Sequence, residues 1–124
     1  DKKEALGFQG FGKYVKVSGY GHSFQFVGLE NPESPNYEFI VAIDALKDPD
    51  PQYSVNLIMR ELNKAYAGFS LFQKIDKVTS GNWGCGVFNG DPELKFMIQW
   101  IAASLAQKQL NYCPFNKLRI DAAR

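Results

Sequence analysis

A glycine-rich segment, residues 81–90, is the strongest chemical signal in the sequence. It reads GNWGCGVFNG and is followed by Asp91-Pro92, a favourable N-cap and first residue for a helix. Glycines let backbone N–H groups approach a ligand closely, and a helix N-terminus adds about half a positive charge. The segment therefore predicts either an anion site, most naturally for phosphate or diphosphate, or a tight strand-to-helix turn without a ligand.

Neither of the two common nucleotide-binding loops fits this segment. A dinucleotide fingerprint requires G-x-G-x-x-G, and Gly84 and Gly86 are followed by Asn89 where the third glycine belongs. It also requires an acidic residue about 20 positions later, and none lies between Glu93 and Asp121. A P-loop ends in Gly-Lys-Ser/Thr, which does not occur in the chain. A Rossmann-type dehydrogenase is therefore disfavoured.

Few other residues offer reactive groups. With one histidine, His22, and two distant cysteines, Cys85 and Cys113, no zinc set can be assembled, and we expect no metal. Cys85 is either a reactive thiol, activated by nearby N–H donors, or a small residue needed for close approach. Asp44 follows an apolar run and is the best candidate in the chain for a catalytic acid. The alternative is a structural role, in which Asp44 caps a loop or pairs with a basic residue such as Arg60.

The segments around the loop alternate between strand and helix patterns. Helical periodicity joins Leu57, Ile58, Leu62, Ala65 and Tyr66, with Gly68 as a natural stop, and again joins Leu94, Met97, Ile98, Ile101 and Leu105. The expected elements are one or two short strands between Ala5 and Phe26, a loop over 28–36, a strand buried on both faces over 39–43, a helix over 54–66, a strand over 75–79, a helix from Pro92 to Leu105 and a strand over 110–115. This order predicts a parallel α/β sheet with right-handed crossovers.

Composition places the chain among ordinary globular proteins. It has 124 residues, enough for one domain or a piece of a larger one, with 45% hydrophobic and 22% charged residues. A net charge of +1 gives no long-range attraction to a polyanion, so we expect no direct DNA binding. Aromatic residues make up 15%, which suits a stacking ligand. Apolar runs are too short to span a membrane, and the first ten residues do not resemble a signal peptide. With only two cysteines, we expect an intracellular location, cytoplasmic or nuclear.

Four segments of the chain resemble one family in the same order. Residues 79–91, TSGNWGCGVFNGD, resemble the diphosphate-binding loop of the poly(ADP-ribose) glycohydrolase family, T-G-N-W-G-C-G-A-F-G-G-D. Residues 40–46 are similar to its I-V-A-I-D-A-L strand, and residues 60–69 to its R-E-L-N-K-A-Y-C-G-F helix. Residues 94–103 resemble the alanine-rich helix after the loop. The similarity reaches back to Ser18-Gly19-Tyr20 and covers nearly the whole chain.

The resemblance implies a macrodomain-type α/β fold, a parallel or mixed sheet flanked by helices, with residues 1–124 forming the C-terminal part of a larger catalytic domain. It also implies ADP-ribose or poly(ADP-ribose) as the ligand, without a cofactor. The diphosphate would lie on residues 84–88, and adenine would stack on two aromatic side chains. The implied substrate-binding residues are Phe24, Asn82, Gly84, Cys85, Gly86, Val87, Phe88 and Phe115.

The catalytic residues of the family are not found in this chain. Family members cleave ribose–ribose bonds with paired glutamates in a Gly-Gly-Gly…Gln-Glu-Glu signature, and this chain has neither Gly-Gly-Gly nor two adjacent glutamates. Glycosidic cleavage needs a carboxylic acid to protonate the leaving oxygen. We therefore expect the acid upstream, in the same protein or on a companion chain, and no activity from these residues alone. The alternative is a non-catalytic ADP-ribose-binding or structural module.

Overall fold

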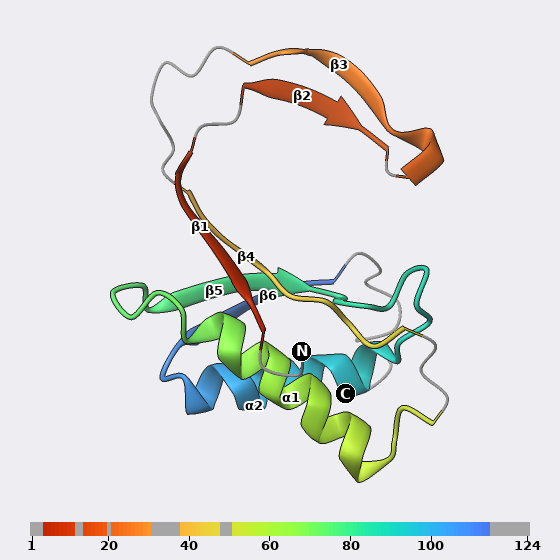
Figure 1. The fold of residues 1–124 in the computed structure, drawn as a ribbon, viewed down its shortest axis with the longest axis vertical. Coiled ribbons are helices and arrows are strands. Elements are labelled where there is room, and N and C mark those ends of the chain that lie inside the picture. Colours follow the sequence, from red (N-terminus) through yellow and green to blue (C-terminus); the bar gives the residue numbers. More distant parts are fainter. Residues whose placement is uncertain (1–3, 12–13, 20, 31–37, 48–50, 115–124) are drawn as a thin grey trace. The chain divides into compact units, whose positions relative to one another are not determined.

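A computed structural model describes residues 4–11, 14–19, 21–30, 38–47 and 51–114. It contains β1 (Leu6–Phe11), β2 (Val15–Ser18), the short 3-10 helix η1 (Gly21–Ser23), β3 (Gln25–Leu29), β4 (Glu38–Ala42), α1 (Val55–Phe69), β5 (Lys77–Gly81), α2 (Pro92–Leu105) and β6 (Gln109–Cys113) (Figure 1). The chain divides into two compact units, one of residues 8–40 and one of residues 1–7 with 41–124. The glycine-rich loop belongs to the second unit.

The unit of residues 8–40 is built on a β-hairpin. β2 and β3 pair antiparallel from Val15↔Leu29 to Ser18↔Gln25, with an irregularity between Lys16 and Val17. The predicted short strands with tight turns are confirmed, but there are three of them rather than one or two. β3 also continues to Leu29, into the loop predicted over 28–36, because it pairs with β2 up to that residue. η1 joins the two strands and directly precedes Phe24.

The second unit contains the predicted strand–helix–strand element. β5 and β6 pair in parallel from Lys77↔Gln109 to Gly81↔Cys113, and α2 connects them. The boundaries of both strands differ by one or two residues from the predicted ones, because the ladder itself runs on to Gly81. β1 pairs with β4 in another sheet. The predicted α/β class is confirmed, but the described strands form three two-stranded sheets and not the single parallel sheet that the sequence predicts.

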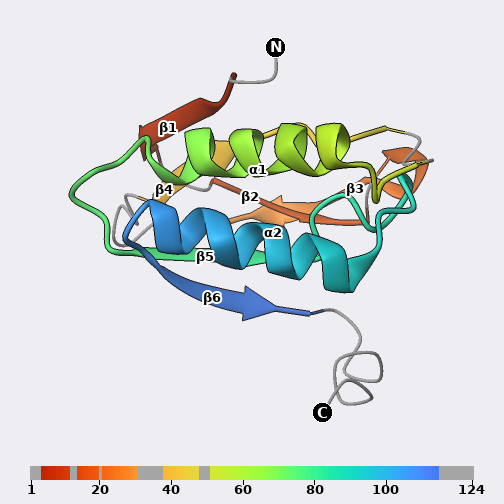
Figure 2. The ribbon, with the colours of Figure 1, turned by 90° about the horizontal axis from the view of Figure 1, so that it is seen from below.

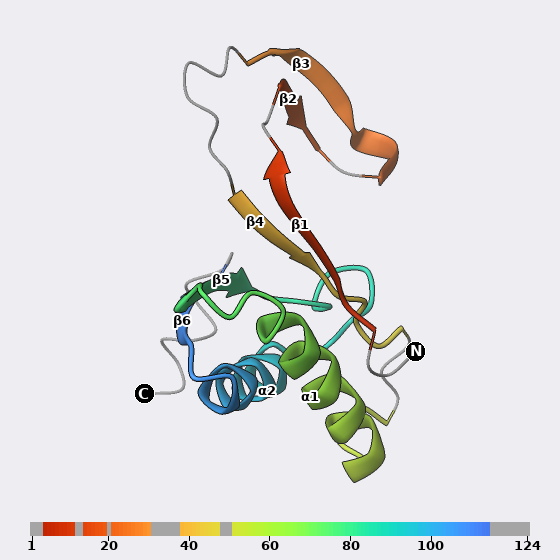
Figure 3. The same ribbon diagram turned by 60° about the vertical axis from the view of Figure 1, so that its left-hand side comes forward.

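The helices α1 and α2 lie side by side, and α2 packs against β6 (Figures 2 and 3). Asp91 caps α2 by accepting a hydrogen bond of 2.8 Å from the N–H of Leu94, which confirms the predicted helix start. Ser54 caps α1 in the same way. The buried core between the helices is formed by Ala65, Phe69, Ile98, Ala102 and Ala103. Small alanine side chains let the helix backbones approach closely.

The buried face of α2 differs from the predicted apolar face. Met97, Ile101 and Leu105 are exposed, whereas Lys95 and Gln99 are buried with Ile98 and the alanines. Burial of a polar side chain requires hydrogen bonds, and Gln99 makes them: its Nε2 donates to the carbonyl oxygens of Gly81 (3.0 Å) and Lys95 (3.2 Å). Close helix packing on alanine outweighs the larger apolar residues on the other face.

Gly68 does not end α1 as the sequence predicts. The helix continues to Phe69, with Ser70 as its C-cap, and Gly68 is buried inside it. A Cβ atom on Gly68 would lie 2.8 Å from the Cγ2 of Ile43 and 2.8 Å from the Cγ1 of Val41. The glycine is therefore required for close packing of α1 on the chain at the end of β4.

The apolar run at β4 is not buried on both faces. Val41 and Ile43 are half-buried, in line with their packing against α1, whereas Phe39, Ile40 and Ala42 are exposed. The strand is therefore covered by a helix on one face only, the arrangement of a half-buried strand.

None of the helices in the described ranges is long and apolar enough to cross a membrane.

Candidate functional site

The glycine-rich loop folds back on itself between β5 and α2. Gly84 has a positive φ of 76°, and a Cβ atom there would lie 2.6 Å from the Cβ of Ala45. Only glycine meets both conditions without strain. Four backbone hydrogen bonds hold the turn, from the N–H groups of Trp83, Cys85, Asn89 and Gly90 to the carbonyl oxygens of Gly81, Asn82, Gly86 and Gly84.

Three successive N–H groups at the tip of the loop are left for a ligand. Within the described residues, the N–H groups of Gly86, Val87 and Phe88 make no hydrogen bond. A Cβ atom on Gly86 would meet nothing within 4 Å, and Val87 is 78% exposed. Such a run of backbone donors forms a concave site that suits anions.

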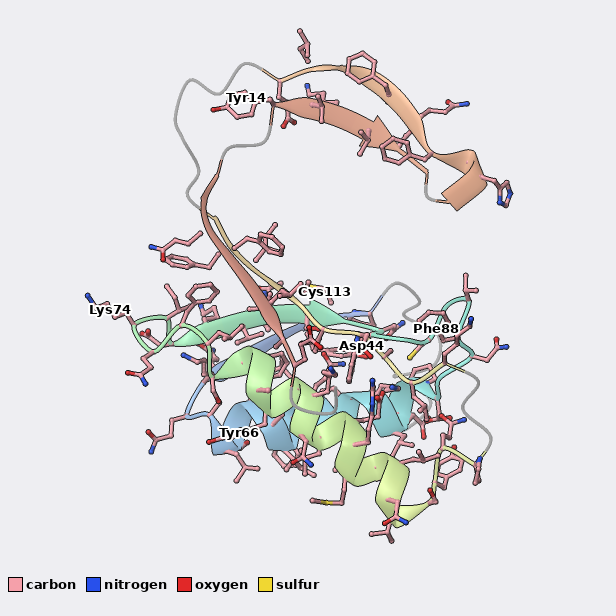
Figure 4. All side chains as sticks on the ribbon, viewed as in Figure 1. Tyr14, Asp44, Tyr66, Lys74, Phe88 and Cys113 are labelled. Carbon is pink, nitrogen blue, oxygen red and sulfur yellow. The ribbon has the colours of Figure 1, made fainter. Side chains whose placement is uncertain are left out.

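A pocket of about 310 Å³ lies between this loop and the end of β4. It is lined by residues 43–45 on one side and by Trp83, Gly84 and residues 86–88 on the other. Figure 4 labels Asp44 and Phe88, one from each side of the pocket. Five of the predicted substrate-binding residues belong to this loop from 84 to 88, and four of these five line the pocket.

The loop is anchored to the body of the unit at its start. The indole Nε1 of Trp83 donates to the carbonyl oxygen of Ile43 at 3.2 Å, and its ring packs against the buried core. Trp83 therefore wedges the loop against the core. Asn82 accepts a hydrogen bond of 2.7 Å from the hydroxyl of Tyr112. That contact uses its side-chain oxygen within the protein, and the predicted contact of Asn82 with substrate stays a prediction.

Asp44 is engaged by two cations. Its carboxylate forms ion pairs with Arg60 and, at 2.8 Å, with the Nζ of Lys64, although 65% of the Asp44 side chain is exposed. Hydrogen bonds from Lys64 and Arg60 lower the pKa of Asp44 from 3.8 to about 2. The carboxyl group is therefore ionised at neutral pH. The expectation that Asp44 pairs with a basic residue such as Arg60 is confirmed.

Cys85 is not an activated thiol. Burial, together with the charge of Asp91, raises the pKa of Cys85 to about 11. The predicted N-cap explains this outcome, because the Asp91 carboxylate sits at the helix N-terminus and offsets its positive end. The raised pKa argues against the reactive-thiol interpretation of Cys85, and the need for a small residue there stays a prediction.

Sequence patterns missed two buried charged residues beneath the loop. Lys95 on α2 forms an ion pair with Glu61 on α1, and each residue is only 2% exposed. The Nζ of Lys95 also lies 4.4 Å from the centre of the Trp83 ring. Lys95 precedes Gln99 by one helical turn, and both occupy the alanine-rich face. That spacing is the signal for them in the sequence.

Neither of the two predicted stacking residues is among the described residues of the unit that contains the loop. Phe24 lies in the hairpin unit and is 59% exposed. Phe115 lies outside the described residues. Stacking of adenine on Phe24 and Phe115 therefore stays a prediction.

The fold and the site define an α/β protein with a glycine-rich loop at the carboxyl end of a parallel strand pair. The chain belongs to the poly(ADP-ribose) glycohydrolase family: residues 1–122 match the family described as "Poly (ADP-ribose) glycohydrolase (PARG), Macro domain fold". The resemblance seen in the loop and its neighbouring segments is thus confirmed, as is the macrodomain-type fold.

Named relatives agree with this assignment. The chain is 32% identical over 151 residues to "Probable poly(ADP-ribose) glycohydrolase 2" of Arabidopsis thaliana, covering 84% of the chain and 29% of that relative. It is 35% identical over 142 residues to "Poly(ADP-ribose) glycohydrolase 1" of Caenorhabditis elegans, covering 96% of the chain and 18% of that relative. The chain therefore spans less than a third of the length of either protein.

Proposed function

We propose that this chain supplies the ADP-ribose-binding half of an enzyme that hydrolyses ribose–ribose bonds in poly(ADP-ribose). The observation that carries the proposal is the row of N–H groups of Gly86, Val87 and Phe88 beside the pocket. Three successive donors match the oxygens of a diphosphate, and hydrogen bonds to a charged acceptor are the stronger kind. Membership of the glycohydrolase family supports ADP-ribose as the source of that diphosphate.

The remaining contacts of the substrate follow from the same proposal. Asn82, Gly84 and Cys85 shape the loop beneath the diphosphate. Phe24 and Phe115 stack on the adenine, a contact that any base-binding site can form with an aromatic face. Residues 1–124 act in this proposal as the C-terminal portion of a macrodomain-type catalytic domain.

The acid that protonates the leaving oxygen is proposed to lie upstream of these residues. Asp44 borders the pocket, but with a pKa of about 2 it holds no proton to donate at neutral pH. Glu61 is buried in ion pairs with Arg60 and Lys95. The catalytic glutamates would then come from an upstream segment of the same protein or from a companion chain.

A non-catalytic ADP-ribose-binding module is the second candidate. The engagement of both Asp44 and Glu61 in ion pairs favours it equally, because neither carboxylate is available as an acid. The two candidates differ only in what accompanies this chain. A binding module would hold ADP-ribose even in its complete protein without releasing any from the polymer.

The test compares ADP-ribose release from labelled polymer by residues 1–124 alone and by the same residues joined to the upstream part of a relative's catalytic domain. We expect release only from the joined form, because loss of general acid catalysis typically costs about 10²–10⁴-fold in rate. ADP-ribose binding without release by the joined form would support the binding module. Turnover by residues 1–124 alone that Asp44→Asn abolishes would make Asp44 the catalyst and overturn the proposal.

A further inference from the structure

A buried ion pair lies directly beneath the glycine-rich loop. The ammonium group of Lys95, in the second turn of α2, pairs with one carboxylate oxygen of Glu61. The other oxygen of Glu61 accepts hydrogen bonds from the N–H of Leu46, at 3.0 Å, and from the guanidinium of Arg60. One carboxylate therefore joins α1, α2 and the chain that follows β4. The chain that follows β4 lines the pocket, and α2 begins directly after the loop.

The side chain of Lys95 contacts the neck of the loop, which is the point where Gly84 and Gly90 meet. A Cβ atom on Gly84 would lie 3.4 Å from the Nζ of Lys95, and one on Gly90 would lie 3.0 Å from its Cε. Gly84 and Gly90 are the residues where the loop closes, through a hydrogen bond of 2.9 Å from the N–H of Gly90 to the carbonyl oxygen of Gly84. The ammonium also faces the ring of Trp83 at 4.4 Å, a cation–π contact. Lys95 thus supports both sides of the neck.

A positive charge at this depth needs a reason, since a buried ion pair is weak evidence for stability and an apolar residue could fill the same space. The charge does two things that an apolar side chain cannot do. It holds the Trp83 ring electrostatically, and it places an ammonium group under the loop that carries the free N–H groups of Gly86, Val87 and Phe88. We propose that Lys95 is a positioning residue for the diphosphate, an inference that rests on the proposed function. Glu61 holds the charged ammonium group of Lys95, and this group fixes the neck of the loop.

Burial makes the proton of Lys95 easier to lose, whereas the ion pair with Glu61 opposes that loss. Burial, followed by the charge of Arg60, lowers the pKa of Lys95 from 10.5 to about 8. The pKa values of Cys85 and Tyr112 are raised to about 11 and about 12, so both groups keep their protons through pH 9.5. The charged groups that act on Lys95 are Glu61, its ion-pair partner, and Arg60, both from α1. Arg60 pairs in turn with Glu61 and with Asp44 at the end of β4.

Binding and folding respond to this titration in opposite directions. Deprotonation of Lys95 removes the charge from beneath the loop, so affinity for a diphosphate falls as the pH rises through about 8. Because the folded state releases this proton more easily than the unfolded state, Lys95 makes the free energy of unfolding rise with pH between about 8 and 10.5. Weaker binding at high pH is therefore not a sign of unfolding caused by Lys95.

The experiment measures the affinity of ADP-ribose and of adenosine by titration calorimetry at pH 7 and pH 9.5. It uses the complete protein in a Cys113→Ser background, which removes an exposed thiol. We expect Lys95→Met to weaken ADP-ribose binding about tenfold at pH 7, because the neck of the loop loses the ammonium group that positions it. Raising the pH to 9.5 should cause most of the same loss in the parent and none in the variant. Adenosine, which has no diphosphate, should be unaffected in both.

Two further variants separate positioning from general stability. Lys108→Met is the control, because Lys108 is a lysine away from the loop whose ammonium group donates to the carbonyl oxygens of Phe72 and Ile75. Its ADP-ribose affinity and pH profile should match the parent. Glu61→Gln combined with Lys95→Met leaves no uncompensated buried charge and keeps the variant folded if Lys95→Met alone does not fold. It should show the same weak, pH-independent binding.

The outcomes distinguish this inference from the function on which it rests. If the parent binds no ADP-ribose, the proposed function is wrong and this inference falls with it. If the parent binds ADP-ribose with an affinity that neither pH nor the combined variant changes, only the role of Lys95 is overturned. Equal losses of affinity for ADP-ribose and adenosine would show that Lys95 stabilises the fold and does not position the diphosphate.

Discussion

The hydroxyl of Tyr112 donates a hydrogen bond of 2.7 Å to the Oδ1 of Asn82, and this contact joins β6 to the first residue after β5. The two strands pair in parallel up to Gly81 and Cys113, so the contact fixes the loop at the point where both strands end. Burial raises the pKa of Tyr112 to about 12, which keeps the hydroxyl protonated as a donor at physiological pH. The loop therefore starts from a rigid edge of the sheet.

Tyr112→Phe is expected to lower the free energy of unfolding by about 1 kcal/mol, the usual net value of one hydrogen bond. The ring keeps its edge-to-face contact with Phe96, whose centroid lies 5.0 Å away, so packing should be unchanged. Denaturant unfolding of parent and variant measures the difference. Identical midpoints and slopes would show that the contact with Asn82 does not hold the start of the loop.

Gly86→Val should abolish tight ADP-ribose binding while leaving the fold intact. Space around the Cβ position of Gly86 is open, so the protein tolerates the side chain, but the isopropyl group stands where the phosphates would approach the N–H groups. Loss of one hydrogen bond to a charged group alone weakens binding about tenfold or more. Gly84→Ala is the contrasting variant: with a φ of 76° and Ala45 at 2.6 Å, it should unfold more easily. Unchanged affinity of the folded Gly86→Val variant for ADP-ribose would mean that the diphosphate does not bind to this loop.

Gly68→Ala is expected to destabilise the protein by about 1–3 kcal/mol, the range for overpacking a core. Alanine is normally favoured over glycine within a helix, so the sign of the effect is diagnostic. Here the added methyl group would lie 2.8 Å from side-chain carbons of Val41 and Ile43. Thermal and denaturant unfolding provide the measurement. A gain in stability would mean that α1 does not pack closely on the end of β4.

Asp44→Asn should leave polymer hydrolysis by the complete protein largely intact, because Asp44 is ionised and paired rather than catalytic. The carboxylate is exposed but pairs with Lys64, whose side chain is fully buried, so its removal is expected to lower the free energy of unfolding by about 1–2 kcal/mol. Since the folded pKa of about 2 lies below the ordinary value of 3.8, that contribution is present above about pH 4 and is lost as the pH falls through about 2. The difference in stability between parent and variant should therefore shrink over that range. Loss of hydrolysis in a folded variant would contradict this role.

Phe24→Ala and Phe115→Ala are each expected to weaken ADP-ribose binding about 5- to 150-fold in the complete protein. This range corresponds to about 1–3 kcal/mol for one base–aromatic stacking contact. Binding of ribose 5-diphosphate, which lacks the base, is the control and should not change. A loss of ADP-ribose affinity smaller than about threefold at either position, with the fold intact, would mean that this phenylalanine does not stack on adenine.

Short segments of the sequence by themselves determine the local features of this protein. The loop of residues 81–90, the cap formed by Asp91 and Pro92, and the strands on either side of α2 all follow from short-range preferences. Caps and turns depend on a few neighbouring residues, and a strand–helix–strand order leaves little choice but parallel pairing. The family motif lies in the same local segments, which is why the sequence is enough to recognise it.

Tertiary structure alone decides which side chains the helices bury. Periodicity places Met97, Ile101 and Leu105 toward the core, but the structure turns Lys95 and Gln99 inward instead. A buried charge is stable only beside its partner, and that partner, Glu61, lies on another helix and far away in the sequence. The same reason explains Asp44, whose acidity is set by Lys64 and Arg60. Contacts between distant segments set the electrostatics of the site, and of these the sequence indicated only the pairing of Asp44 with Arg60.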